Sequence, residues 1–191
     1  MNKAVMISIR PKWCEKILKG QKTIEVRKNA PKLATPFKCY IYCTAAKGKE
    51  MYHVPITKES LSLPGCPCTV GNKRVVAEFT CDKIVEAEWD YKPDWNGEVY
   101  GDTLYLLKGS CLSEKEIISY GNGDKVNGYV YGWHISDLKI YAEPLSIDHF
   151  RKADFNCKRN GIDPKVRHSC YGCRDCEIKR PPQSWCYVED I

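Results

Sequence analysis

The sequence predicts a mixed α+β fold: a curled sheet or small β-barrel of five to six strands with two or three short helices. The chain opens with a strand, a helix and a second strand, and loops rather than helices join its later strand-like segments. It also lacks the glycine-rich phosphate-binding motifs of P-loop and dinucleotide-binding folds. Nothing therefore indicates nucleotide hydrolysis or a dinucleotide cofactor.

The strands are predicted from runs of apolar, aromatic and β-branched residues. The first, residues 4–9, is short and apolar. The second, residues 23–28, alternates, with Ile24 and Val26 on the core side and polar side chains on the other. The remaining strands are predicted at residues 37–44, 73–88 and, as one strand or two, 129–141.

Two short helices have clear end signals. Pro11 suits the first turn of a helix that runs to about residue 19, and Gly20 suits the position after its end. A later helix is predicted after Ser113, because Glu116 completes a capping box. Residues 45–72, rich in Pro and Gly, predict a long connection.

We expect an α+β domain over residues 1–146 and a Cys-rich extension over residues 147–191 that packs on it. Residues 1–50 hold 12 Lys and Arg against 3 Asp and Glu, and residues 151–191 hold 9 against 6. These basic ends are either one positive face for a polyanion such as nucleic acid, or a set of solvated lysines.

The polar face of the second strand carries charged residues at close spacing. Lys22 precedes this strand, and Glu25 and Arg27 lie two residues apart on it. They form either a structural ion pair or a ligand site, in which Glu25 accepts from a base amine and Arg27 binds a phosphate. If the protein is an enzyme, Lys22 and Glu25 are its candidate acid and base groups.

Four segments form a recognisable pattern: Ile9-x-Pro11-Lys12, Gly20-x-Lys22-Thr23-x-Glu25-x-Arg27, Ala77-Glu78-Phe79-x-Cys81 and Trp133-His134-Ile135-Ser136. Through these residues the chain resembles the ASCH domain, a branch of the PUA-like superfamily related to EVE and YTH domains. The closing segment 181–189 resembles the end of a bacterial and phage subgroup of these proteins.

This resemblance implies a β-barrel with a cleft beside the first helix that holds RNA or a modified nucleobase. It also implies an alternative, because some members are hydrolases that deacetylate N4-acetylcytidine or cleave RNA. Lys22 matches the lysine of the deacetylase branch, but Glu25 stands where that branch has a threonine. A third alternative is a phage protein-interaction module.

The predicted ligand is RNA or a nucleotide-like molecule, with aromatic side chains available for stacking. His134 is either an acid–base group or a hydrogen-bonded structural residue. The residues expected to bind the ligand are Lys12, Trp13, Lys22, Thr23, Glu25, Arg27 and Trp133.

The Cys-rich tail has the spacing of a metal site. Cys157, Cys170, Cys173 and Cys176 follow the pattern Cys-x12-Cys-x2-Cys-x2-Cys, which predicts a structural zinc with four thiolate ligands. An iron–sulfur cluster or free thiols are the alternatives. Further possible ligands are His168, Cys186, Cys66 and Cys68.

The sequence contains no apolar run long enough to span a bilayer and no signal-peptide pattern at its start. We therefore expect a cytoplasmic protein without a membrane partner. Its 12 cysteines are expected to be thiols or metal ligands rather than disulfides. A monomer is the default expectation for its oligomeric state.

Overall fold

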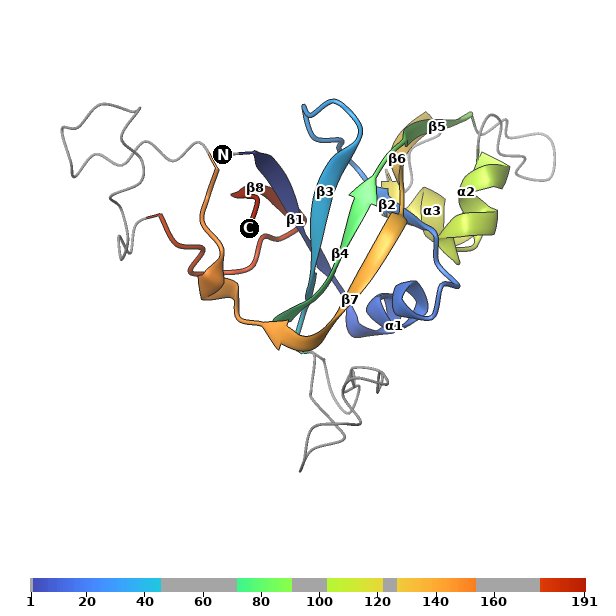
Figure 1. The fold of residues 1–191 in the computed structure, drawn as a ribbon. Helices are drawn as coiled ribbons and strands as arrows, with labels where there is room; N and C mark the ends of the chain where they lie inside the picture. The colour runs from blue at the N-terminus through green and yellow to red at the C-terminus, as the bar shows by residue number, and fades with distance from the viewer. Residues whose placement is uncertain (1, 46–71, 91–102, 122–126, 154–175) are drawn as a thin grey trace. The chain divides into compact units, whose positions relative to one another are not determined.

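The computed structural model describes residues 2–45, 72–90, 103–121, 127–153 and 176–191 (Figure 1). Within these ranges the chain forms eight strands, three α-helices and one short 3₁₀ segment. Two compact units can be distinguished. Unit 1 comprises residues 1–11, 38–78 and 141–191, and unit 2 comprises residues 12–37 and 79–140.

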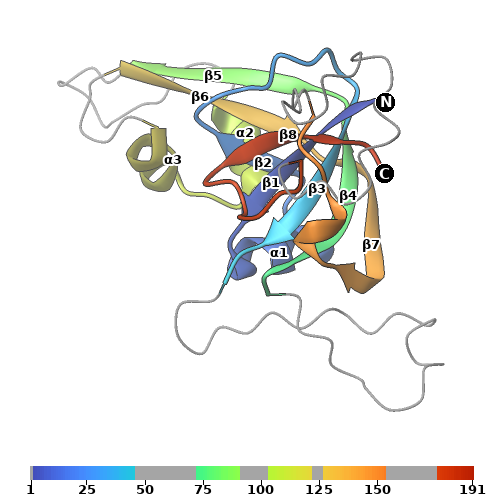
Figure 2. The same ribbon diagram turned by 90° about the vertical axis from the view of Figure 1, so that its left-hand side faces the viewer.

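The larger sheet has five strands and an open order, which can be followed across Figure 2. Strand β1 pairs in parallel with β3 on one side and antiparallel with β8 on the other. In spatial order, the strands are β7 (Ser136–Leu145), β4 (Arg74–Cys81), β3 (Phe37–Cys43), β1 (Lys3–Ile9) and β8 (Trp185–Glu189).

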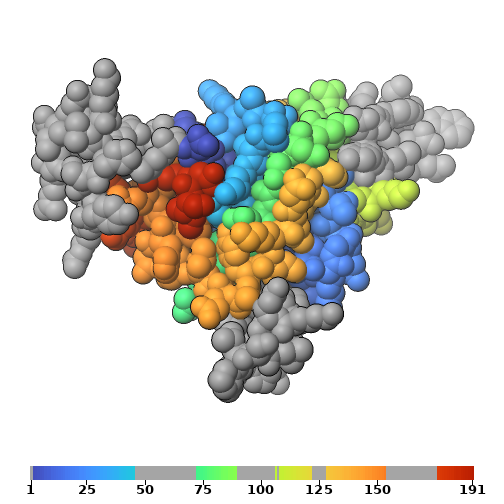
Figure 3. All heavy atoms as spheres, in the orientation of Figure 1, coloured from blue at the N-terminus to red at the C-terminus, as the bar shows by residue number. Residues whose placement is uncertain are grey.

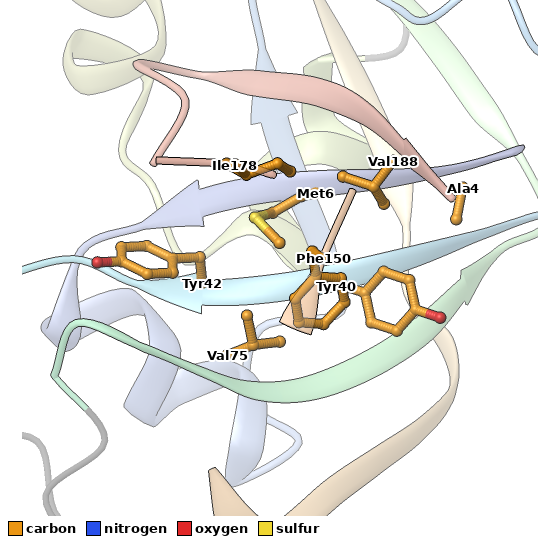
Figure 4. Close-up of a cluster of buried hydrophobic side chains, with 8 residues drawn as sticks. All are labelled: Ala4, Met6, Tyr40, Tyr42, Val75, Phe150, Ile178 and Val188. Carbon is orange, nitrogen blue, oxygen red and sulfur yellow. The ribbon is translucent and has the colours of Figure 1, made fainter. Parts of the chain in front are cut away.

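An apolar cluster on this sheet forms the core of unit 1. Met6 of β1, Tyr40 of β3 and Phe150 lie together in it (Figure 4). The rings of Tyr40 and Phe150 meet edge to face, with centroids 4.8 Å apart. Strand β8 adds Val188 to this cluster. Because β8 pairs with β1, the first and last strands of the chain lie side by side in the space-filling view (Figure 3).

Unit 2 contains the second sheet, in the order β2 (Ile24–Arg27), β6 (Asn127–His134) and β5 (Ile84–Asp90). Helix α2 (Thr103–Ser110) packs against β2 and β5, and α3 (Glu114–Gly121) packs against β6. A Cβ atom on Gly132 of β6 would lie 2.0 Å from Leu106 of α2. Glycine therefore permits the close approach of this helix.

The end signals of two helices are confirmed. Helix α1 (Pro11–Leu18) is followed by Gly20, which has a φ of 70°, as expected of a residue just after a helix. At α3, the backbone N–H and the hydroxyl of Ser113 both donate to the Glu116 carboxylate, at 2.8 and 2.9 Å. This is the predicted capping box.

The α+β class is confirmed, but the barrel expectation is wrong, because the eight strands in the described ranges form two sheets that are not closed into a barrel. The predicted strand 73–88 is two strands, and the chain changes sheets between β4 and β5 at Asp82 and Lys83. Asp82 and Lys83 interrupt the apolar run at this point, so this polar pair was a usable sequence signal for the change.

The predicted boundary near residue 146 lies inside unit 1. Residues 185–189 of the predicted extension form β8 and pair with β1, whereas residues 154–175 lie outside the described ranges. The division into domain and extension therefore stays a prediction. Among the helices in the described ranges, none has the length and apolar character needed to cross a bilayer.

Candidate functional site: a buried ion cluster in unit 2

The polar residues predicted on the second strand come together in unit 2. Two backbone hydrogen bonds hold the chain after the turn at Gly20. The N–H of Lys22 donates to the Lys16 carbonyl at 3.1 Å, and the N–H of Thr23 donates to the Gly109 carbonyl at 2.9 Å. Strand β2 then pairs with β6, placing Glu25 opposite Trp133. Local turn geometry and sheet pairing therefore fix the position of each charged side chain.

The ammonium group of Lys22 has its hydrogen-bond donors engaged. Its Nζ donates to the carbonyl oxygens of Ile24 at 2.7 Å and of Ser110 at 2.8 Å, and lies 3.3 Å from Glu25 Oε2. Ser110 is the last residue of α2, so its carbonyl is at the negative end of the helix dipole. This environment holds a cation in a fixed place.

Glu25 bridges two cations. Its Oε1 accepts from Arg27 Nη2 at 2.9 Å, while its Oε2 faces Lys22. All three residues are buried, with exposed fractions of 3% for Lys22, 7% for Glu25 and 7% for Arg27. The buried ion cluster, as we call these three residues, therefore carries one net positive charge.

Half-buried and exposed aromatic residues border the buried ion cluster. The Trp13 ring centroid lies 5.4 Å from Lys22 Nζ. Burial raises the pKa of Tyr120, while the charge of Arg27 and a hydrogen bond from it act to lower that pKa. Lys28 Nζ lies 5.5 Å from the Tyr120 ring, so cations and aromatic rings alternate here.

The expected residues fall into two groups. Lys12, Trp13 and the buried ion cluster are brought together, and Thr23 is exposed directly before β2. Trp133 is instead fully buried, edge to face with Phe37 at a centroid distance of 6.0 Å. Its expected stacking on a base is therefore corrected: Trp133 is a core residue of unit 2.

Sequence reasoning missed three neighbours of the site. Ser110 contributes its backbone carbonyl, and the residue type does not reveal such a contact because every residue has this group. Tyr120 lies in α3, far from β2 in sequence. Lys16 follows Trp13 by three residues on α1, and this helical spacing was a usable signal for their contact.

His134 is hydrogen-bonded to the side chain of Asp82. Its Nδ1 lies 2.7 Å from Asp82 Oδ1. His134 is the last residue of β6, and Asp82 directly follows β4. The hydrogen bond to His134 lowers the pKa of Asp82. The hydrogen bond fixes the imidazole ring, which suits both predicted alternatives, a structural histidine and an acid–base group.

Most of the predicted metal site lies outside the described ranges. This applies to Cys157, Cys170 and Cys173, and also to the possible additional ligands His168, Cys66 and Cys68. Cys176 is described and is buried. Cys186 packs against the core of unit 1, where burial raises its pKa to about 11. The residues with described positions contain no group of three metal-ligating side chains, and the zinc stays a prediction.

Comparison with known proteins identifies the fold. No family model matches the chain, and no curated protein matches it. Among solved structures, it is similar to ASCH from Zymomonas mobilis, with a TM-score of 0.53 and 18% identity over 97% of this chain and 87% of that one. A tyrosine-to-phenylalanine mutant of the same protein gives a TM-score of 0.52 and 18% identity, over 98% and 91% of the two chains. The chain therefore has the fold of the ASCH domain.

Proposed function

We propose that this protein binds nucleic acid, most specifically RNA or a modified nucleobase, at the buried ion cluster. One observation supports this function best: Lys22, Glu25 and Arg27 are buried together with one net positive charge. A buried net charge is costly, so a site of this kind favours a ligand with negative charge or strong acceptors.

The cluster also offers groups that suit a nucleobase edge. A carboxylate oxygen has two lone pairs, so each oxygen of Glu25 can accept a further hydrogen bond beside its present cation. An exocyclic base amine is a matching donor, and the Arg27 guanidinium matches base acceptors. Recognition of a base by hydrogen bonds at its edge is how single-stranded RNA is commonly read.

The hydrolase alternative receives less support from the geometry. A base or nucleophile needs a free lone pair on Lys22 Nζ, whereas this ammonium donates to two carbonyls and faces Glu25. Turnover of N4-acetylcytidine and of labelled RNA tests it directly. Turnover that is lost in Lys22→Ala would replace binding by hydrolysis as the proposed function.

Binding is tested by titrating the protein with single-stranded RNA and with free and modified nucleosides at low salt. We expect Arg27→Ala to weaken RNA binding at least about tenfold, since hydrogen bonds to charged groups contribute about 1.5–3 kcal/mol. Lys22→Ala should weaken it as well, because it removes the net positive charge of the cluster and one of the two cations that hold Glu25 in place. Lys19→Ala is the matched control, because Lys19 is exposed and paired with Glu15 on α1.

Each variant is checked for folding by its thermal transition before binding is measured. Unchanged RNA affinity in folded Arg27→Ala and Lys22→Ala would contradict the proposal. If the wild-type protein binds none of these ligands, a protein-interaction module becomes the better explanation.

A further inference from the structure

Three lysine side chains converge on one tryptophan of unit 2. The Nζ atoms of Lys12, Lys16 and Lys22 lie 4.8, 5.3 and 5.4 Å from the centroid of the Trp13 ring. The π face of the indole attracts each of these ammonium groups, but the ring carries no negative charge that would neutralise them.

The three lysines differ in how their charge is balanced. Lys22 is buried and faces Glu25, whereas Lys12 is exposed and Lys16 half-buried. Within the described ranges, no ion pair joins Lys12 or Lys16 to a carboxylate. Lys19, on the same segment, is by contrast paired with Glu15 at 2.5 Å.

Glu116, an acidic residue whose pKa the charges of Lys12 and Lys16 lower, is already engaged in a cap. Hydrogen bonds from the backbone and side chain of Ser113 lower the pKa of Glu116, and the charges of Lys12 and Lys16 lower it further. The Glu116 carboxylate accepts two bonds from Ser113 in the cap of α3. Glu116 therefore attracts Lys12 and Lys16 through its charge, but it forms no ion pair with either of them in the described ranges.

We infer that Lys12 and Lys16 form a phosphate subsite beside the buried ion cluster, so that the ligand is a phosphorylated nucleotide unit rather than a free nucleoside. This inference rests on the proposed function. A phosphate carries up to two negative charges and three acceptor oxygens, which two flexible ammonium groups can share.

The shared contact with Trp13 connects the two parts of the site. Because Lys22 and the subsite lysines lie around the same ring, a base at the buried ion cluster and its own phosphate at Lys12 and Lys16 belong to one nucleotide. In this arrangement, Arg27 remains paired with Glu25 and serves the base edge. The phosphate is bound by Lys12 and Lys16 of α1.

The test compares the dissociation constants of a nucleoside, its 5′- and 3′-monophosphates, and a short single-stranded RNA by calorimetry at low salt. We expect the wild-type protein to bind one monophosphate at least about tenfold more tightly than the nucleoside, as a charge-assisted contact predicts. In Lys12→Gln/Lys16→Gln this ratio should fall to about one. Lys19→Gln should leave it unchanged.

The RNA measurement distinguishes the source of the phosphate. If the phosphate belongs to a strand, the double variant should reduce the slope of log K against log salt by about 0.7 per lost phosphate contact. If it belongs to a free nucleotide, only the monophosphate ratio should change. Equal affinity of the wild type for nucleoside and monophosphates, or a preference retained in the double variant, would overturn the inference.

The two proposals fail in different ways. If nucleosides bind without a phosphate preference, the subsite is wrong and the nucleobase site stands. If neither nucleosides nor nucleotides nor RNA bind, both are wrong.

Discussion

Replacing Glu25 by glutamine removes the only anion of the buried ion cluster while keeping nearly the same side-chain volume. The substitution breaks the ion pairs at 2.9 Å with Arg27 and at 3.3 Å with Lys22. It leaves two cations in a place where neither residue is more than 7% exposed. We therefore expect Glu25→Gln to destabilise the protein strongly.

The magnitude follows from the cost of leaving a buried charge without its partner, about 3–5 kcal/mol. Glutamine retains one acceptor oxygen, which favours the lower end, about 3 kcal/mol. For a chain of 191 residues this corresponds to a fall in Tm of about 6–12 °C. Urea unfolding and calorimetry measure both quantities.

The matched control is Glu15→Gln, which removes the exposed partner of Lys19. Exposed ion pairs contribute about 0–1 kcal/mol, so the control should lose little stability. The double variant Glu25→Gln/Arg27→Gln should be more stable than the sum of its single changes predicts, because it removes one of the two repelling cations. A loss below about 1 kcal/mol in Glu25→Gln would show that the cluster is solvated and refute the reasoning.

Two further predictions concern the other end of the chain. Burial raises the pKa of Asp190, but hydrogen bonds from Lys38 and Tyr40 outweigh it and hold that pKa below its usual value. Asp190 therefore stabilises the fold above about pH 4, and this contribution disappears as the pH falls through its folded-state pKa. The difference in unfolding free energy between wild type and Asp190→Asn should be constant from about pH 5 to 7 and shrink at about pH 3. An equal difference at about pH 7 and about pH 3 would contradict this prediction. For the metal, elemental analysis should find about one zinc per chain, lost in Cys170→Ser/Cys173→Ser; a metal-free wild-type protein would contradict it.

Much of the first half of the fold was predictable because its signals are local. Pro11 and Gly20 define the ends of α1, and the aromatic and β-branched run at residues 37–43 defines β3. The pairing of Glu25 with Arg27 was also predictable, since alternate residues of a strand share a face.

The rest depends on tertiary contacts that a single sequence does not reveal. Helix α2 is only eight residues long and mostly apolar, so its residues give no clear helical period. The Ser110 carbonyl at its end nevertheless holds Lys22. In the same way, the burial of Trp133 results from its neighbours rather than from its residue type.

The central place of β1 has a consequence for how the protein folds. Its pairing with β3 joins residues about 35 positions apart, whereas its pairing with β8 joins Val5 to Tyr187. During synthesis, the apolar strand β1 must therefore wait for residues 185–189 with one hydrogen-bonding edge open. An open apolar edge invites pairing with other chains, so we expect aggregation to compete with folding until β8 has docked.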